Sequence, residues 1–469
     1  MSAPPANVLD TVVKHNFCCS CGMCAAVCPS RNLRMTETEH GEYRPEPTGS
    51  CADSCRLCLE VCPFSNEHGQ DEDTLGLDLF GSESECTHDD ALGWVRDTYV
   101  GGLANETERL KAPSGGLATA VLCQLLRDKE IDAAVVLHPM DERPWYGSVI
   151  AETEEEVLSS RGSVYHVAPF DDVLHKIATG PERSHAVVAL PCAAKAIRLA
   201  QKRMPSLRRR IRYVLGLTCG GYRSLLFADL LTALMGRSTG RLRYRSKRYC
   251  RTSRDYRAEI EANGSVRSVR MLGLFGYLWV NEVGGLQSCQ FCDDVFAETA
   301  DATFMDAWLP EYRADRRGTN LVVSRNAKLS GILESFFEAG TCEGGPIDAE
   351  KIRQSQSELL ENRRNLLAPR CELAEETLGY APKKRLALCS AHDRQTQQAE
   401  ARRQWGFFVD VRGELLRFRR RSKGKPGWLR RWRAWRLCWK VLLIARRHGV
   451  LSRTFRASKH LSPRAASSE

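Results

Sequence analysis

Apolar residues between positions 94 and 345 follow two patterns along the chain. In some segments they recur every three or four positions, which is typical of amphipathic helices, and in others they form short continuous runs, which is typical of buried strands. The expected elements are helices over 114–127, 192–203 and 225–235 and strands over 133–137, 186–190 and 211–217. Strands that alternate with helices predict an α/β core with a largely parallel sheet.

A hairpin is expected after this core, over residues 256–271. Asn263-Gly264 lies at its centre, and this dipeptide tolerates the positive φ angles of a type I′ turn. Residues 69–93 are acidic, contain several glycines and lack periodicity, so we interpret them as a linker.

Charge is distributed unevenly along the 469 residues. From residue 412 onward there are 18 Lys and Arg and two acidic residues, so this part has a charge of +16. Because the whole chain has a net charge of +10, residues 1–411 have a charge of −6. The chain is long enough for two or three domains, and no apolar run approaches the length of a membrane span. The N-terminus lacks the pattern of a secretory signal, so a cytoplasmic location is expected.

Eight of the twenty cysteines form two runs near the N-terminus. The first run fits C-x2-C-x2-C-x3-C-P, whereas the second has three residues between its first two cysteines. This spacing is typical of two-cluster ferredoxins, in which three thiolates of one run hold a [4Fe–4S] cluster and the fourth crosses to the other cluster. The predicted ligand sets are Cys18, Cys21, Cys24 and Cys62 for one cluster and Cys51, Cys55, Cys58 and Cys28 for the other.

Zinc is the main alternative for these cysteines. Structural zinc sites usually take two C-x2-C pairs set a dozen or more residues apart, so a packed triplet favours iron–sulfur clusters. Disulfides are less expected still, because twenty cysteines kept as metal ligands and free thiols fit a reducing compartment.

Four further cysteines follow predicted strands or lie in a later loop. Cys192 and Cys219 come directly after strands, and Cys289 and Cys292 form a C-x2-C pair. Ligands of open α/β sheets gather at the carboxyl edge of the strands, so these cysteines are candidates for a third cluster. From the residues alone, buried free thiols explain Cys192 and Cys219 equally well.

A second candidate site lies where the helix over 114–127 begins. Ser114, Gly115 and Gly116 place a hydroxyl and two side-chain-free amides at a helix N-terminus, which suits a phosphate. A serine N-cap with no ligand explains the same residues. The Gly162-Ser163-Val164-Tyr165 turn is a weaker signal, and His166 after it is a weak candidate for a proton donor.

The order of several segments resembles the family of coenzyme F420 hydrogenase/dehydrogenase beta subunits. The matching segments, between residues 97 and 340, are APSGGLATAVLCQLL, IDAAVVL, GSVYHVAP, ALPCAAKAI, GLTCGGYRS, CQFCDDVFAETADATFMDAW and GTNLVVSRN. The preceding cysteine runs are similar to the version of the family with a fused N-terminal iron–sulfur domain. Any single segment would be a weak signal, and the order makes the resemblance specific.

The resemblance implies FAD and a third [4Fe–4S] cluster in the core. By position in the family motifs, Cys192, Cys219, Cys289 and Cys292 would hold that cluster. Ser114, Gly115, Gly116, Thr119, Gly162, Ser163 and Tyr165 would line the flavin site. No catalytic residue is assigned.

Three residues depart from the family pattern. Val164 stands where relatives commonly have Lys, Ala193 where they often have Gln, and Met305 where they often have Gly. Asp306 is a further polar candidate, either as a cofactor contact or as an acid at the end of a strand. Lys195 is another, either as an anion contact or as an exposed charge on a helix. Some substrate-facing polar groups are therefore lost, so electron transfer is predicted more firmly than any named hydride donor.

The expected fold class is α+β and α/β, with six segments. They are a two-cluster ferredoxin-type domain (1–68), a linker (69–93), the N-terminal (94–180) and C-terminal (181–345) parts of the beta subunit-like core, a helical extension (346–411) and a basic Trp/Arg-rich tail (412–469). The predicted function is an oxidoreductase that transfers electrons between a small-molecule hydride donor or acceptor, such as coenzyme F420, and a redox protein partner. The alternative is a non-catalytic electron-relay subunit of a larger complex.

The basic tail predicts a contact of its own. Trp428, Trp432, Trp435, Trp439 and Leu442 recur at helical spacing among arginines, which favours peripheral contact with an anionic membrane. Docking onto a partner subunit is the second interpretation. Nucleic acid is not expected, because no recognised reader module accompanies the charge. The residues over 417–425 are interpreted as disordered.

Overall fold

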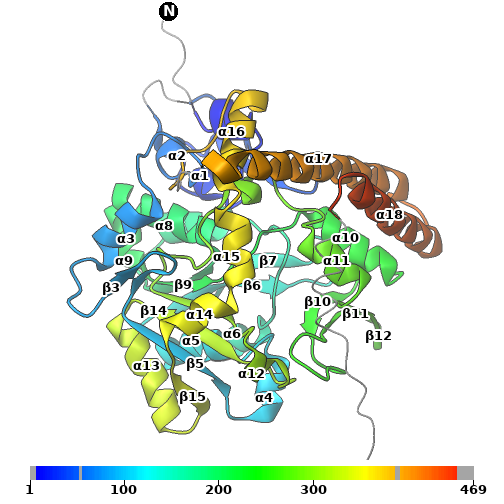
Figure 1. Cartoon of the computed structure of the whole chain (residues 1–469). Helices are drawn as coiled ribbons and strands as arrows, with labels where there is room; N and C mark the ends of the chain where they lie inside the picture. Colours follow the sequence, from blue (N-terminus) through cyan, green and yellow to red (C-terminus); the bar gives the residue numbers. More distant parts are fainter. Residues whose placement is uncertain (1–6, 52–54, 386–390, 451–469) are drawn as a thin grey trace, which may run out of the picture.

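An eight-stranded mixed sheet forms the centre of the molecule (Figure 1). The structure is a computed structural model, and it describes residues 7–51, 55–385 and 391–450. The strand order is β15-β5-β14-β13-β9-β8-β6-β7, and only the pairs β13–β9, β9–β8 and β8–β6 are parallel. The strands are β5 (Asp97–Leu103), β6 (Ala133–Pro139), β7 (Tyr146–Ala151), β8 (His185–Ala189), β9 (Ile211–Leu217), β13 (Ala302–Asp306), β14 (Asn320–Ser324) and β15 (Cys342–Pro346).

The predicted elements of the core are present, and the direction of the outer strands differs from the prediction. The strands expected over 133–137, 186–190 and 211–217 are β6, β8 and β9, which are parallel neighbours. The remaining strands pair antiparallel at both sides, so the expectation of a largely parallel sheet is wrong. An apolar run buried on both faces looks the same in either direction, which is why periodicity did not reveal this.

Helices cover both faces of the sheet. Alternate residues of the central strands face opposite sides, so Val135 and Val187 pack with α7 and α8, whereas Ala134 and Ala186 pack with α5 and α13. The helices on the two faces are α7 (Asp171–Thr179), α8 (Pro191–Arg203), α9 (Pro205–Arg210), α5 (Leu117–Arg127), α6 (Glu154–Ser159) and α13 (Ala327–Glu338). The short helices α4 (Glu106–Lys111) and α12 (Pro310–Arg313) lie in connections.

A three-stranded sheet and an apolar helix pair stand beside the main sheet. The predicted hairpin is formed by β11 (Arg257–Ala262) and β12 (Ser265–Arg270), joined by Asn263 and Gly264 with φ angles of 51° and 69°. These positive angles confirm the type I′ turn expected from the dipeptide. The other elements are β10 (Arg241–Ser246), α10 (Leu225–Leu234) and α11 (Leu274–Val280).

The N-terminal part consists of short elements around the cysteine runs. They are η1 (Leu9–Val13), α1 (Met23–Ala26), α2 (Leu57–Glu60), and a hairpin of β1 (Leu33–Glu37) and β2 (Tyr43–Pro47). The segment that we interpreted as a linker contains α3 (Glu72–Phe80) and β3 (Thr87–Asp89), which pairs with β4 (Gly93–Val95). Asp71 caps α3 by accepting from the Thr74 N–H. These residues therefore form part of the folded body.

The C-terminal helices return to the N-terminal part. They are α14 (Ala349–Ser355), α15 (Ser357–Arg364), α16 (Leu367–Leu378), α17 (Ala391–Ser422) and α18 (Gly427–Arg447). In Figure 1, α17 crosses the top of the molecule from the N-terminal helices to α18. Leu367 and Ala374 of α16 share a core with Phe17 and Leu59.

The basic tail is mostly part of the folded body. Leu437 and Val441 of α18 are buried against α10, together with Phe407 and Leu415 of α17. Residues 417–422 are the last turns of α17, so the interpretation of 417–425 as disordered is wrong for them. Residues 451–469 lie outside the described residues. Within the described ranges, no helix is long and apolar enough to cross a membrane.

Candidate functional site

The first predicted ligand set comes together in the N-terminal part. Burial raises the pKa of the Cys24 thiol most, and the nearby thiols of Cys21, Cys18 and Cys62 raise it further. Burial likewise raises the pKa of Cys62, followed by the influence of Cys21. These four cysteines, from both runs, are therefore neighbours, and Cys58 of the other predicted set lies near Cys24 and Cys62 as well. The two runs meet, and their division into two ligand sets stays a prediction.

The second set is brought together only in part. Burial raises the pKa of Cys58, and Cys51 and Cys55 contribute to the shift. Cys28 packs against the same hydrophobic cluster as Cys58 and Cys62. Cys51 is exposed at the surface, unlike the first set.

The four core cysteines also meet. Cys192 lies in the first turn of α8, Cys219 follows β9, and Cys289 and Cys292 lie in or next to the 3-10 helix η2 (Ser288–Phe291). Burial, followed by the nearby thiols of Cys289 and Cys192, raises the pKa of Cys219 to about 12. Cys192 also contributes to the raised pKa of Cys292, after burial. The strand ends and η2 thus deliver four thiols to one place, which sequence separation had left open.

Backbone N–H groups point at two of these sulfurs. The Gly221 N–H donates to Cys219 Sγ and the Tyr222 N–H donates to Cys289 Sγ, both at 3.3 Å. Hydrogen bonds of this kind favour the thiolate, which is the form that binds metal. The Arg363 guanidinium donates to the Cys289 and Gly220 carbonyls and adds positive charge nearby.

A single metal ion and a cluster require different spacings of the ligand sulfurs. A tetrahedral zinc ion needs its ligands about 2.3 Å from one point. Across the described residues, no three Cys, His, Asp or Glu side chains are grouped in that way. A four-iron cubane separates its ligand sulfurs more widely, so loosely grouped, partly buried thiols are compatible with it.

Cys19 connects the two groups of cysteines. Its pKa is raised first by the Cys192 thiol and then by Cys21, so it lies between the N-terminal and the core cysteines. Gln287 and Ser288 of the core also donate to the carbonyls of His15 and Cys18. The N-terminal cysteine loop therefore packs directly on the core. Cys19 was not assigned from the sequence, because only one cysteine of the adjacent pair is in register.

A cavity of about 700 Å³ adjoins the core cysteines. Its wall contains Cys19, Cys21, Cys192 and Cys219. The predicted flavin-site residues that line it are Ser114, Gly116, Thr119, Gly162, Ser163 and Tyr165. Gly115 lies behind them, where a Cβ would meet the Gly101 carbonyl at 2.6 Å.

The loop before α5 is shaped by its backbone. Gly116 is the N-cap residue with a φ of 92°, and Ser114 Oγ donates to the Thr319 carbonyl at 3.0 Å. The alternative in which Ser114 caps the helix is therefore wrong. The buried Lys247 ammonium donates to the Ser114 carbonyl at 2.8 Å and to the Arg109 carbonyl at 3.1 Å. The loop is held from behind, and its front faces the cavity.

Several charged and aromatic residues in the cavity wall were not predicted. Arg245 forms an ion pair with Asp306 at 2.6 Å and lies over the ring of Tyr256. The other unpredicted residues are Arg161, Arg223, Arg254, Trp279, Trp308 and Arg313. They come from elements far apart in the sequence, which periodicity cannot bring together.

The departures from the family pattern all line the cavity. Val164, Ala193 and Met305 contribute to its wall. His166, in contrast, is fully buried and is not part of this wall. Lys195 is buried too, with Glu72 at 3.2 Å, so its interpretation as an anion contact or an exposed charge is wrong.

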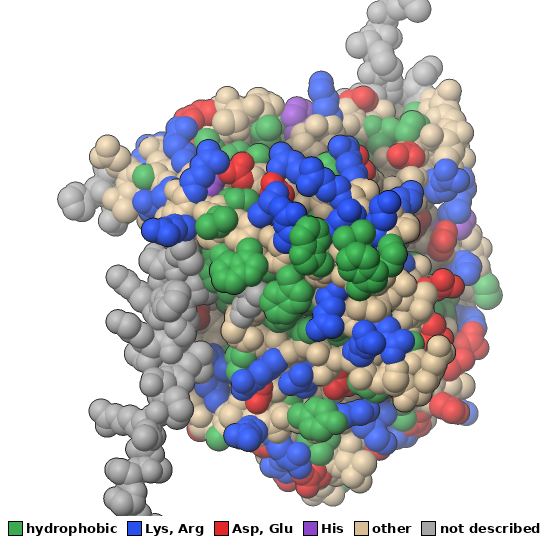
Figure 2. Space-filling view, turned by 90° about the vertical axis from the view of Figure 1, so that its right-hand side faces the viewer, with side chains coloured by type: hydrophobic (Ala, Val, Ile, Leu, Met, Phe, Trp, Pro, Cys, Tyr) green, Lys and Arg blue, Asp and Glu red, His purple; other side chains and the backbone are tan. Residues whose placement is uncertain are grey.

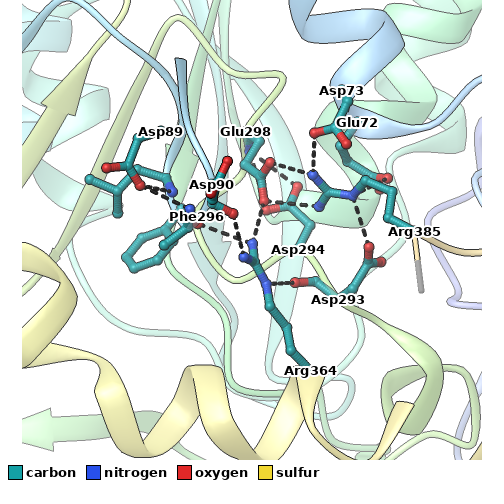
Figure 3. A network of polar contacts seen from close by, with 12 residues as sticks. Glu72, Asp73, Asp89, Asp90, Asp293, Asp294, Phe296, Glu298, Arg364 and Arg385 are labelled. Carbon is teal, nitrogen blue, oxygen red and sulfur yellow. Dashed lines mark hydrogen bonds and ion pairs between the residues drawn. The ribbon is translucent and has the colours of Figure 1, made fainter. Parts of the chain in front are cut away.

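Buried carboxylates follow the last core cysteine and pair with C-terminal arginines (Figure 3). Arg385 Nε lies 3.0 Å from Asp293, and its Nη1 atom lies 2.7 Å from Glu298. Arg364 reaches Glu298 at 3.0 Å. Burial raises the pKa of Asp294, and Glu298 raises it further. Asp293, Asp294, Glu298 and Asp301 lie within nine residues, and such a density of acids was a sequence signal for cationic partners elsewhere in the chain.

The fold and the cavity define an α/β protein with grouped cysteines beside a cavity of about 700 Å³. Residues 98–175 match the N-terminal part of the coenzyme F420 hydrogenase/dehydrogenase beta subunit, and residues 182–350 match the C terminus of the same beta subunit. Together these ranges cover more than half of the chain. The chain therefore belongs to the family of coenzyme F420 hydrogenase/dehydrogenase beta subunits, which confirms the resemblance. The matched ranges include the core cysteines and begin after the N-terminal runs.

Two relatives match over part of their length. The F subunit of the F(420)H(2) dehydrogenase of Methanosarcina mazei is 24% identical over 216 residues, which are 44% of this chain and 54% of that protein. The beta subunit of the coenzyme F420 hydrogenase of Methanosarcina barkeri is 30% identical over 129 residues, 26% of this chain and 44% of that protein. The chain spans about half the length of the curated relatives it matches.

One solved structure is similar at a lower level. It is the xenon-derivatised F420-reducing [NiFe] hydrogenase complex from Methanosarcina barkeri, with a TM-score of 0.49 and 20% identity. The match covers 64% of this chain and 99% of the matched chain.

Proposed function

We propose that this protein is an iron–sulfur flavoprotein oxidoreductase. It would transfer electrons between a small-molecule hydride donor or acceptor, of the coenzyme F420 type or another, and a redox protein partner. The observation that carries the proposal is the wall of the 700 Å³ cavity, to which both the predicted flavin-site residues and Cys192 and Cys219 contribute. A small molecule in this cavity is next to the cysteines.

The residues of the cavity fit FAD. The Gly116 turn begins α5 beside the cavity, and the Leu117 N–H there donates to Asn320 Oδ1 at 3.2 Å. The N–H groups of Ala118 and Thr119, which also line the cavity, are the ones we propose for a phosphate. Tyr165 and Trp279, with ring centroids 4.4 Å apart, give an aromatic wall for a flat ring system. FAD would supply the exchange between two-electron and one-electron chemistry that hydride donors and clusters require.

The cysteines would hold three [4Fe–4S] clusters. Cys192, Cys219, Cys289 and Cys292 are the ligands proposed for the core cluster. The two N-terminal sets are those given by the crossed pattern. Because Cys19 lies between Cys21 and Cys192, the core cluster would be next to the N-terminal cluster on Cys18, Cys21, Cys24 and Cys62. Cys51 is exposed, so the other N-terminal cluster is the one we assign to the protein partner.

A non-catalytic relay subunit is the second candidate. Val164 and Ala193 make the cavity wall more apolar than the Lys and Gln of the family pattern would, and Met305 fills space that a Gly would leave open. Both changes weaken the binding of a polar substrate. The two candidates differ in one measurable property. Only the oxidoreductase should lose its flavin absorbance when a purified small-molecule donor is added without any other protein.

Anaerobic purification with iron, sulfide and flavin analysis tests the proposal. About twelve iron atoms per chain are expected for three clusters, and about eight would confine the clusters to the N-terminal part. Titration with NADH, reduced ferredoxin and the reduced deazaflavin in turn then identifies the donor. A colourless protein without iron contradicts the proposal.

Cys219→Ser tests the core ligands. We expect about four of twelve iron atoms to be lost, because one cluster loses a thiolate ligand while the N-terminal sets are untouched. Cys342→Ser is the matched control, since Cys342 is also a buried cysteine but lies on β15, outside both groups. Equal iron content in the two variants would remove Cys219 from the ligand set.

A further inference from the structure

The outward face of α18 carries a row of exposed tryptophans. Trp428, Trp432, Trp435 and Trp439 are 73%, 50%, 42% and 67% exposed, and Leu443 beside them is 65% exposed. Their spacing of three or four residues puts them on one side of the helix. Figure 2 looks onto this side of the molecule and shows large hydrophobic side chains grouped among Lys and Arg. We call this surface the tryptophan face.

The opposite side of α18 fixes the orientation of this face. Leu437, Cys438 and Val441 are buried in a core that α10 and α17 share. Leu442, which the sequence placed with the tryptophans, is half-buried and packs against that core. Because the helix is anchored along its inner side, the tryptophans are not exposed by an undocked tail. They belong to the surface of the folded protein.

The charged side chains of α18 itself are all positive. Residues 427–447 contain seven Lys and Arg and no side chain with a carboxylate, an amide or a hydroxyl group. Arg430, Arg431 and Arg436 form no ion pair with any residue that the structure describes. Arg436 lies 4.8 Å from the ring centroid of Trp432. Guanidinium groups without a carboxylate partner therefore flank exposed indoles.

A shallow groove adjoins the same face. It has a volume of about 560 Å³ and is lined by Gly236, Arg267, Gly427, Trp428, Arg431, Trp432 and Trp435. Two arginines and three indoles around one hollow suit an anionic headgroup with apolar groups beside it.

We propose that the tryptophan face binds the surface of an anionic lipid bilayer. Indoles favour the boundary between headgroups and acyl chains, and arginines are attracted to anionic lipids. A specific protein interface usually has a polar rim with satisfied hydrogen bonds, and α18 offers no acceptor side chain for one. The bilayer requires only cations and indoles. This proposal does not depend on the redox function.

Vesicle flotation of the full chain tests the proposal. Vesicles of equal parts phosphatidylglycerol and phosphatidylcholine should carry the protein, and pure phosphatidylcholine vesicles should carry it at least about tenfold less well. Trp432→Ser/Trp435→Ser should weaken binding about tenfold or more. Arg431→Gln and Arg436→Gln should each weaken it about fivefold, and added salt should weaken it further.

Matched controls come from the far side of the molecule. Leu77→Ser removes a side chain that is 57% exposed on α3, and Arg208→Gln/Arg209→Gln removes two exposed charges on α9. Both should bind as the unchanged protein does. If the unchanged protein does not float with anionic vesicles, or if the tryptophan variant floats equally well, the proposal is overturned. The face is then assigned to an acidic protein partner.

Discussion

His166 has both ring nitrogens engaged inside the protein. Nε2 is 2.8 Å from the Pro144 carbonyl, to which it donates, and Nδ1 accepts from the Tyr244 hydroxyl at 2.5 Å. Burial lowers the pKa of His166 to about 3. A neutral ring with no free nitrogen does not donate a proton to a substrate, so the role considered from the sequence is wrong.

The buried ring makes stability depend on pH. The pKa of His166 is about 3 in the folded state and about 6.5 in the unfolded state, so only the unfolded state gains the proton between these values. The free energy of unfolding should fall as the pH drops from about 6.5 to 3, by about 4 kcal/mol from this residue. His166→Gln should flatten that slope in urea denaturation at pH 7, 6 and 5. An unchanged slope would contradict the assignment.

At the residue scale, the cysteine runs could be recognised in the sequence as candidate ligands, whereas the partners of the buried charges could not. The spacing of Cys18, Cys21 and Cys24 predicts a site within a few positions of sequence. Arg385, by contrast, pairs with Asp73 and Glu298, which are 312 and 87 residues away. No local pattern encodes such a contact, because it depends on how the elements pack.

The helix α3 shows why one element was missed. Its polar sequence looked like a linker, yet Glu72 at its start is 4% exposed and lies 3.2 Å from Lys195 of α8. An amphipathic helix is recognised in a sequence by its apolar face, and a charged residue that points inward interrupts that face. The same pair of helices also carries an exposed ion pair, Lys202 with Asp78.

These two pairs should differ sharply in their contribution to stability. Lys195→Met leaves the buried Glu72 carboxylate short of a partner, which should lower the free energy of unfolding by about 3 kcal/mol. Lys202→Met removes an exposed pair between the same helices and should cost less than about 1 kcal/mol. Chemical denaturation of both variants measures the difference. Equal effects would mean that Glu72 is not desolvated as described.

At the scale of the whole molecule, the high positive charge of residues 412–469 led to a wrong prediction of where the tail lies. Residues 412–469 looked like a separate basic unit, yet Val441 and Ala445 are fully buried under the cover of α10 and α17. The buried positions of α18 hold small and medium residues that arginine and tryptophan outnumber in the sequence. Hydrophobic periodicity therefore identified the exposed tryptophan stripe and missed the packed one.

Two neighbouring substitutions distinguish a packed helix from an attached tail. Val441→Asp buries an unpaired carboxylate and should lower the free energy of unfolding by more than about 3 kcal/mol. Leu443→Asp, two positions away on the exposed side, should change it by less than about 1 kcal/mol. Thermal and urea unfolding of the full chain give both values. A small effect at Val441 would show that α18 is not part of the body.

The return of the C-terminal helices to the N-terminal cysteines sets an order of events during synthesis. Tyr380 stacks on His15 and donates to the Phe64 carbonyl, so the cover over the cysteine loops is made by residues translated more than 300 positions later. At about 5–20 residues per second, Cys62 leaves the ribosome roughly 15 to 65 s before this cover exists. Throughout that interval the first thiols of the nascent chain are accessible from a side that the finished protein closes.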